Sequence, residues 1–166
     1  LGDLLRRSLS SEASPLTPLG EEVEAAQAYL GLETLRYPDR LHVQWEIDPA
    51  LAKALIPRFA LQTLIENIIK HGVGQTQRLV SARVTAKPLA DGDMEIRVWN
   101  DAVATKAPQN GKPSGTRVGI SNLGQRLEIL FPGRARLEAG FITPDQFESR
   151  LRLPISVEAG DESADC

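Results

Sequence analysis

The sequence predicts an α/β two-layer sandwich, in which a mixed β-sheet packs on helices gathered on one face. Its segments follow the order helix, helix, strand, helix, strand, strand, loop, helix, strand, strand, judged from apolar residues at helical or alternating spacing. Strands joined both by hairpins and by helical crossovers are typical of such a mixed sheet. A chain of 166 residues, 42% hydrophobic and 25% charged, has the size and composition of one globular domain.

Charge and cysteine content exclude several classes of function. The net charge of -3 and the pI near 5.5, with basic residues scattered along the chain, argue against nucleic-acid binding. Cys166 is the only cysteine, so an intrachain disulfide is excluded and we expect a cytoplasmic location. No apolar run is long enough for a membrane span, and we expect no membrane contact by this chain. Because it begins at Leu1, we interpret it as part of a longer protein, whose membrane attachment stays open.

The first half of the chain contains two helical segments and a strand. Residues 1–9 have the apolar spacing of the end of an amphipathic helix, and residues 10–18 collect serines and prolines, which predicts a linker. Residues 19–35 return to helical spacing, with Glu21 and Glu22 in the first turn, where acidic side chains favour the helix dipole. Residues 41–47 alternate as a strand does.

The segment 57–74 is the strongest helix prediction. Pro57 suits the first helical position and Gly72 suits the position just past the end. Asn67, Lys70 and His71 recur at a spacing of three and four residues, which places their side chains on one helix face, away from the apolar positions. We hypothesise that this polar face contacts the phosphates and metal of a nucleotide, although alone it is also typical of a solvated helix face.

The second half contains the remaining strands and a long loop. Residues 78–86 and 94–99 alternate as strands and form a predicted hairpin through an Asp-Gly-Asp turn. Residues 102–117 have neither periodicity and are predicted to form a long surface loop, a type of segment that is usually functional or disordered. Helical spacing returns at residues 118–131, and residues 135–139 and 147–155 form a final predicted strand pair.

Four segments resemble LytS-type sensor histidine kinases in order and approximate spacing. These segments are LGDLLRRSL, AYLGLETLRYPDRL, LQTLIENIIKHGV and GTRVGISNLGQRLEILFPG, and the resemblance covers roughly residues 1–155. It implies the Bergerat-type ATP-binding fold that is shared with gyrase, Hsp90 and MutL. In this fold a nucleotide is held between helices and covered by a lid.

The resemblance implies roles for the polar residues of segment 57–74. The stretch LIENIIKHG is similar to the N box of the family, in which Asn67 would coordinate Mg²⁺ through its amide oxygen. Lys70 would place a positive charge by the phosphates, and His71 would contact the nucleoside. Related ATPases have a hydrolytic glutamate four residues before this asparagine, and this chain has Thr63 there. The site is therefore suited to transfer of a phosphoryl group rather than to vigorous hydrolysis.

Two glycine-rich segments of the family have counterparts here. GTRVGISN resembles the second glycine box, in which the backbone at Gly115 and Gly119 would approach phosphate, followed by Ile120 and Asn122 in the same ATP-binding segment. Arg117 stands where the family often has a third glycine.

The first glycine box departs further from the family pattern. This chain reads Asn-Asp-Ala-Val-Ala from Asn100, with alanines in place of two family glycines. Asn100 would read adenine through its amide oxygen, without the charge of the aspartate that is usual in the family.

The phosphoacceptor histidine of the family has no counterpart, since the only histidines are His42, in a predicted strand, and His71. We divide the chain into residues 1–18 (the tail of the dimerisation and phosphoacceptor helices with a linker), 19–157 (an ATP-binding kinase domain) and 158–166 (an acidic tail).

The resemblance implies a catalytic domain that uses ATP and Mg²⁺ and donates the γ-phosphate to a histidine outside this chain. Its partners would be the phosphoacceptor domain of the same protein, a second copy in a homodimer, and a response regulator. A degenerate regulatory domain that binds nucleotide weakly or not at all is the main alternative. An anti-sigma type serine kinase is a further one, which leaves the first forty residues unexplained.

Overall fold

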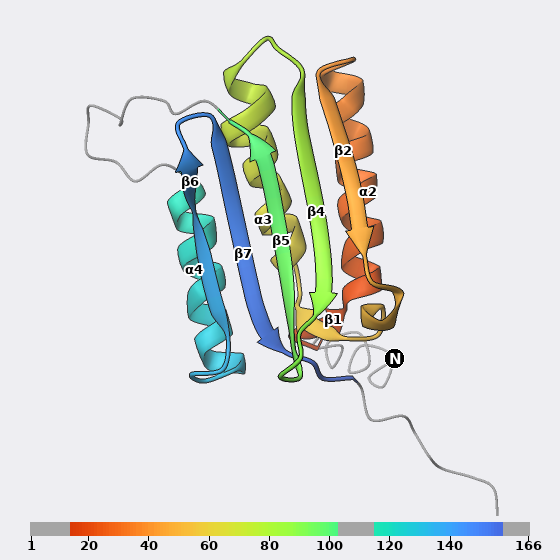
Figure 1. Ribbon diagram of the computed structural model, residues 1–166, viewed down its shortest axis with the longest axis vertical. Helices are drawn as coiled ribbons and strands as arrows, with labels where there is room; N and C mark the ends of the chain where they lie inside the picture. The colour runs from red at the N-terminus through yellow and green to blue at the C-terminus, as the bar shows by residue number, and fades with distance from the viewer. Residues whose placement is uncertain (1–13, 103–114, 158–166) are drawn as a thin grey trace, which may run out of the picture.

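The computed structural model describes residues 14–102 and 115–157. Predictions for residues 1–13, for most of the loop 102–117 and for the acidic tail therefore lie outside the described residues. The elements follow one another as β1 (Leu16–Pro18), α2 (Leu19–Arg36), β2 (Leu41–Ile47), η1 (Pro49–Leu51), β3 (Leu55–Pro57), α3 (Ala60–Asn67), η2 (Ile68–Gly72), η3 (Val73–Gln75), β4 (Val80–Pro88), β5 (Asp93–Asp101), α4 (Gly115–Leu130), β6 (Arg136–Thr143) and β7 (Gln146–Pro154) (Figure 1).

The architecture is the predicted two-layer α/β sandwich over a mixed sheet. The strand order is β2-β4-β5-β7-β6, with β2 parallel to β4 and the other pairs antiparallel. Helices α2, α3 and α4 lie side by side behind this sheet and leave its other face open (Figure 1). The predicted hairpin is confirmed as β4 and β5. No helix of the described residues is both long and apolar enough to cross a membrane.

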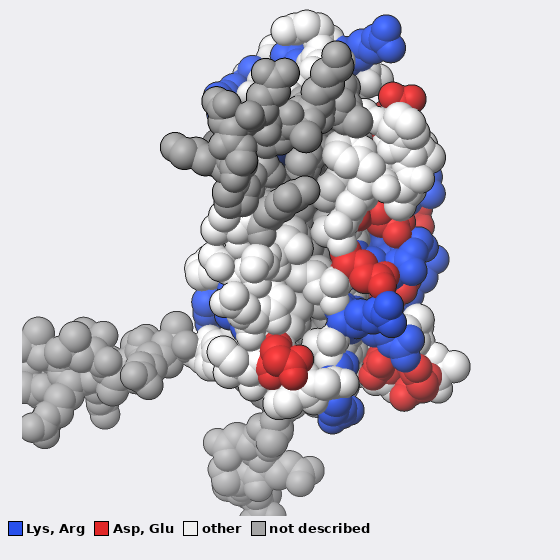
Figure 2. Space-filling model, turned by 90° about the vertical axis from the view of Figure 1, so that its left-hand side faces the viewer, with Lys and Arg blue, Asp and Glu red and all other residues white. Residues whose placement is uncertain are grey.

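Alternation along the strands separates the two faces of the sheet. In β5 the apolar side chains of Met94, Ile96 and Val98 are buried against the helices, while the residues between them lie on the open face and are half-buried. Charged side chains gather on that open face, which forms the right-hand side of the molecule in Figure 2. The core between sheet and helices therefore consists of one face of each element, as the sequence pattern predicts.

Three predicted boundaries are wrong. Residues 115–117, predicted as the end of the long loop, already belong to α4. Residues 16–18, predicted as linker, form strand β1, which pairs antiparallel with β3 and places Leu16 opposite Pro57. Pro57 consequently ends a strand instead of opening a helix, and α3 begins at Ala60 after the N-cap residue Phe59. Strands this short carry no periodicity of their own, and their pairing depends on contacts across 41 positions of sequence that no local pattern reveals.

Candidate nucleotide site

The predicted nucleotide helix changes its geometry at its centre. The α-helical turns of α3 end at Asn67 and continue as the π-helical turn η2, which ends at Gly72. π-Helical turns are rare and are frequent at functional sites. Simple helical spacing predicted that Asn67, Lys70 and His71 share one helix face. The wider turn changes the direction of the side chains that follow Asn67, and the three residues lie in different environments.

Asn67 is buried between the helix and the sheet. Its side chain is 2% exposed, and its Nδ2 donates a hydrogen bond of 3.5 Å to Oγ of Ser149 on β7, a residue that is fully buried. This contact directs the amide nitrogen toward the sheet. The amide oxygen Oδ1 is not used in the hydrogen bond to Ser149. Ser149 was not predicted as part of the site, because only the register of β7 brings it beneath Asn67.

Lys70 is exposed and forms an ion pair. Its Nζ lies 3.8 Å from Oε2 of Glu66, one turn earlier, and the side chains are 45% and 37% exposed. An exposed pair of this kind contributes little to stability. The ammonium is consequently available to a more strongly charged partner such as a triphosphate.

His71 lies in a cluster of aromatic rings. Its imidazole stacks on Phe147 of β7, with ring centroids 4.6 Å apart and an interplanar angle of 12°, and Phe141 of β6 packs edge-on against both rings. Burial lowers the pKa of His71, and the nearby charge of Lys70 lowers it further. The buried Nε2 atom has no hydrogen-bond partner among the described residues.

Asn100 lies at the end of β5, beside this cluster. It is fully buried and opposite Phe147 in the pairing of β5 with β7. Its Nδ2 donates to the carbonyl oxygen of Asp101 at 2.7 Å, and its buried Oδ1 has no partner among the described residues. Buried polar atoms without a partner are rare in proteins, and each calls for an explanation such as a missing ligand.

Gly72 permits the close approach of the helix to this strand end. A Cβ atom at this position would lie 3.0 Å from the carbonyl oxygen of Asp101 and 3.2 Å from Nδ2 of Asn100. The sequence identified Gly72 only as the residue past a helix end. The structure adds that a side chain there would press against the end of β5 at Asn100 and Asp101.

Helix α4 brings the predicted second glycine box to α3. A Cβ atom on Gly119 would lie 3.5 Å from Cγ2 of Thr63, so the first turns of α4 pass closely over the middle of α3. Gly115 opens the helix, Ile120 is half-buried against the core, and Asn122 is exposed. The hydroxyl of Thr63 donates to the carbonyl oxygen of Phe59 at 2.7 Å and is therefore engaged within its own helix.

These contacts order the predicted residues along one line. Thr63 and Gly119 mark one end, Asn67 the middle, and His71 with Asn100 the other end. Thr63 precedes Asn67 by four residues of α-helix, which is about 6 Å at 1.5 Å per residue, and His71 follows on the π-helical turn. The described residues contain no cluster of three His, Cys, Asp or Glu side chains that could hold a metal. A hard cation bound here would need Asn67 together with ligand oxygens, which suits Mg²⁺.

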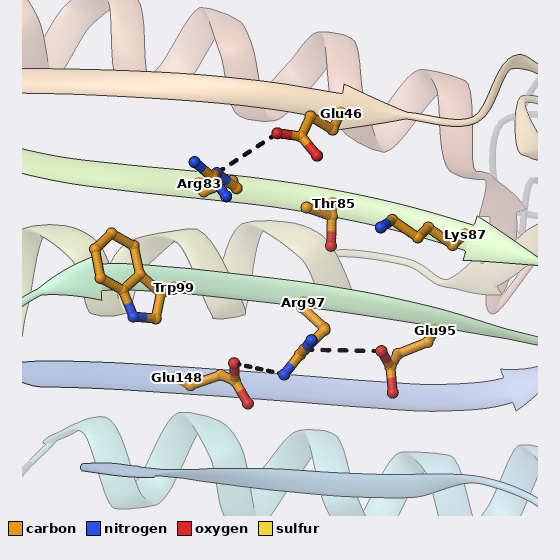
Figure 3. A pocket seen from close by; sticks show the side chains of 8 residues that line it. All are labelled: Glu46, Arg83, Thr85, Lys87, Glu95, Arg97, Trp99 and Glu148. Atoms are coloured by element: carbon orange, nitrogen blue, oxygen red, sulfur yellow. Dashed lines mark hydrogen bonds and ion pairs between the residues drawn. The ribbon is translucent and has the colours of Figure 1, made fainter. Parts of the chain in front are cut away.

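The open face of the sheet has a hollow of about 340 Å³ that is separate from these residues. Figure 3 shows its lining side chains on β2, β4, β5 and β7, among them Trp99. Arg97 lies 3.0 Å from Glu148 and 3.7 Å from Glu95, so the charges pair among themselves. Trp99 points into this hollow, whereas its neighbour Asn100 points toward the helices, because neighbouring strand residues point to opposite faces.

Comparison with known proteins identifies the family. A model of the family described as histidine kinase matches residues 1–41. Sensor protein LytS of Staphylococcus haemolyticus is 41% identical over 145 residues, which cover 82% of this chain and 25% of the relative. Sensor protein LytS of Bacillus subtilis is 31% identical over 169 residues, covering 96% of this chain and 28% of the relative. The chain belongs to the LytS-type sensor histidine kinases.

Solved structures place the LytS-type chain in the histidine kinase catalytic-domain fold. The nucleotide-free catalytic domain of histidine kinase ThkA has a TM-score of 0.62 at 12% identity and covers 84% of this chain and 96% of its own. ThkA in complex with response regulator protein TrrA has a TM-score of 0.56 at 12% identity, covering 93% and 47%. The LytS-type chain spans about a quarter of the length of its curated relatives. Its fold is that of a histidine kinase catalytic domain, and its fold and family are as predicted.

Proposed function

We propose that this domain binds ATP along the line from Thr63 to Asn100 and donates the γ-phosphate to a histidine outside this chain. The buried Oδ1 of Asn100, which has no hydrogen-bond partner within residues 14–102 and 115–157, carries the proposal. An acceptor in that position matches the amine of adenine, which donates a hydrogen bond. From there the triphosphate would extend toward Gly119, where α4 contacts α3.

Each further residue has a role that follows from its surroundings. Lys70 contributes positive charge from the exposed side, and the backbone from Gly115 to Gly119 contributes N–H donors at the start of α4. Asn67 contacts Ser149 through its amide nitrogen, which leaves its amide oxygen as the atom that would hold Mg²⁺. When bound, Mg²⁺ would neutralise part of the triphosphate charge. Phosphoryl transfer of this kind depends on positioning and charge stabilisation.

The engaged hydroxyl of Thr63 supports transfer over hydrolysis. A carboxylate base at this position would activate water, but Thr63 has only a neutral hydroxyl, which is too weak a base and donates its proton to Phe59. The γ-phosphoryl group would therefore pass to an imidazole nitrogen on the phosphoacceptor domain, with ADP as the leaving group. We further propose that the full-length protein is a membrane-anchored homodimer that serves a response regulator. The ThkA complex with TrrA supports the last partner by analogy of fold.

The aromatic cluster favours a second candidate, a regulatory domain with weak nucleotide binding. Phe147 is 6% exposed and its ring stacks directly on His71, so that part of the adenine end is filled by protein. The two candidates differ in their affinity for nucleotide. A filled site must open before a base can bind, and its apparent affinity is reduced by the fraction of molecules in which the site is open.

Titration calorimetry with ATP, with and without Mg²⁺, tests the proposal directly. Saturable binding that strengthens with Mg²⁺ is expected, and absence of saturable binding at millimolar nucleotide would overturn the active-site proposal in favour of the regulatory one. Incubation with a separately produced phosphoacceptor domain then tests transfer. Phosphohistidine should appear on that domain and should be lost in the Asn67→Ala variant.

A further inference from the structure

The peptide group that joins Arg58 to Phe59 is hydrogen-bonded at both ends to charged side chains. Nη2 of Arg126, on α4, donates to the carbonyl oxygen of Arg58 at 2.7 Å. The N–H of Phe59 donates to Oε1 of Glu22, on α2, also at 2.7 Å. Because the carbonyl and the N–H belong to one planar unit, a guanidinium and a carboxylate from two helices hold the same rigid group.

This peptide precedes a residue in an unfavourable conformation. Phe59 has φ 63° and ψ 14°, the left-handed region that bulky residues rarely adopt, and its side chain is 58% exposed. Glu22 is only 6% exposed, so its carboxylate requires hydrogen bonds where it lies. Hydrogen bonds to charged groups are stronger than those between neutral groups. The two contacts therefore fix a corner that the backbone alone would not keep.

The incoming chain is attached to the same corner. The N–H of Arg58 donates to the carbonyl oxygen of Pro15 at 2.9 Å, and its Nε donates to the carbonyl oxygen of Ser14 at 3.2 Å. Strand β1 continues this attachment by pairing with β3. Segments from three distant parts of the sequence therefore meet at the first residues of the nucleotide helix.

We propose that Glu22 and Arg126 are positioning residues for ATP, acting through the Arg58–Phe59 peptide, and the inference rests on the proposed function. Helix α3 carries Asn67 and helix α4 carries Gly119, so the spacing of the two helices sets the distance between the metal ligand and the phosphate-binding backbone. The double hydrogen bond fixes this spacing from the start of α3. Loss of either charged side chain frees the same peptide, and the effects of the two losses are therefore not additive.

The test is a double-mutant cycle on ATP affinity in the full 166-residue chain. The variants are Glu22→Met, which removes both acceptor oxygens and keeps a stem of similar length, Arg126→Met, which keeps the stem, and both together. The matched controls are Glu24→Met on α2 and Arg134→Met after α4, both at exposed positions. Titration with MgATP well below the unfolding temperature, with folding checked by circular dichroism, separates affinity from stability. Arg126→Lys replaces Arg126→Met if the latter does not fold.

Each single variant should weaken ATP binding by roughly three- to tenfold. The double variant should bind about as weakly as the weaker single variant, and both controls should match the wild type. A wild-type chain that fails to bind ATP overturns the proposed function and this role with it. A wild-type chain that binds, with folded variants that bind equally well or lose affinity additively, overturns only the positioning role.

Discussion

Replacing Asn100 by aspartate should lower stability and raise ATP affinity at the same time. Nδ2 of Asn100 donates to the carbonyl oxygen of Asp101 at 2.7 Å, and a carboxylate oxygen in its place would repel that carbonyl. A buried polar group left without its partner costs about 1–3 kcal/mol, and a domain of this size loses about 2–4 °C in Tm per kcal/mol. The expected fall in Tm is thus about 2–12 °C. Because desolvation raises the pKa of a buried carboxyl, the loss of stability grows with pH.

The gain in affinity has a different origin. An ionised acceptor bonded to the adenine amine is stronger than the neutral amide by about 1 kcal/mol, which is roughly fivefold in Kd. Thermal unfolding without nucleotide and titration with MgATP measure the two effects separately. Asn100→Ala is the comparator and should lose both stability and affinity. If Asn100→Asp remains folded and binds ATP more weakly than the wild type, Oδ1 of Asn100 is not the adenine acceptor.

Further substitutions test the remaining parts of the site. Ser149→Ala leaves Nδ2 of Asn67 without its partner and should cost about 1–3 kcal/mol of unfolding free energy, measured in urea, while weakening the Mg²⁺ dependence of ATP binding. An unchanged Mg²⁺ dependence would contradict the role of Ser149. Gly72→Ala places a Cβ 3.0 Å from the carbonyl oxygen of Asp101 and should destabilise the domain by about 1–3 kcal/mol, whereas Gly31→Ala, in open space, should not.

His71 has a folded-state pKa below its ordinary value of 6.5, so its neutral form is favoured by folding. Its contribution is complete above pH 6.5 and is lost as the pH falls below that value. The wild type should therefore lose more stability than His71→Phe between about pH 7.5 and pH 5.5. Equal losses in urea unfolding would show that protonation of His71 is not responsible.

Part of the site could be predicted because it depends on local sequence. The apolar spacing of α2 and α3 and the alternation of β2 and β5 identify these elements, since a core-facing side must recur with the period of the backbone. The segments LQTLIENIIKHGV and GTRVGISN, through their resemblance to the family, identified the two stretches that the structure places in contact at Thr63 and Gly119. The exposed Lys70 pairs with Glu66 one turn away, and this contact also follows from helical spacing.

The sequence by itself determined the class of fold, the family and the chemical character of the nucleotide helix. The tertiary structure alone decided that Asn67 rests on Ser149, that His71 stacks on Phe147, and that Glu22 and Arg126 share one peptide group. Each of these pairs joins residues far apart in the chain. Periodicity tells which face of an element is buried, but the partner of each side chain depends on strand register and helix packing, which form only when the whole domain closes around its core.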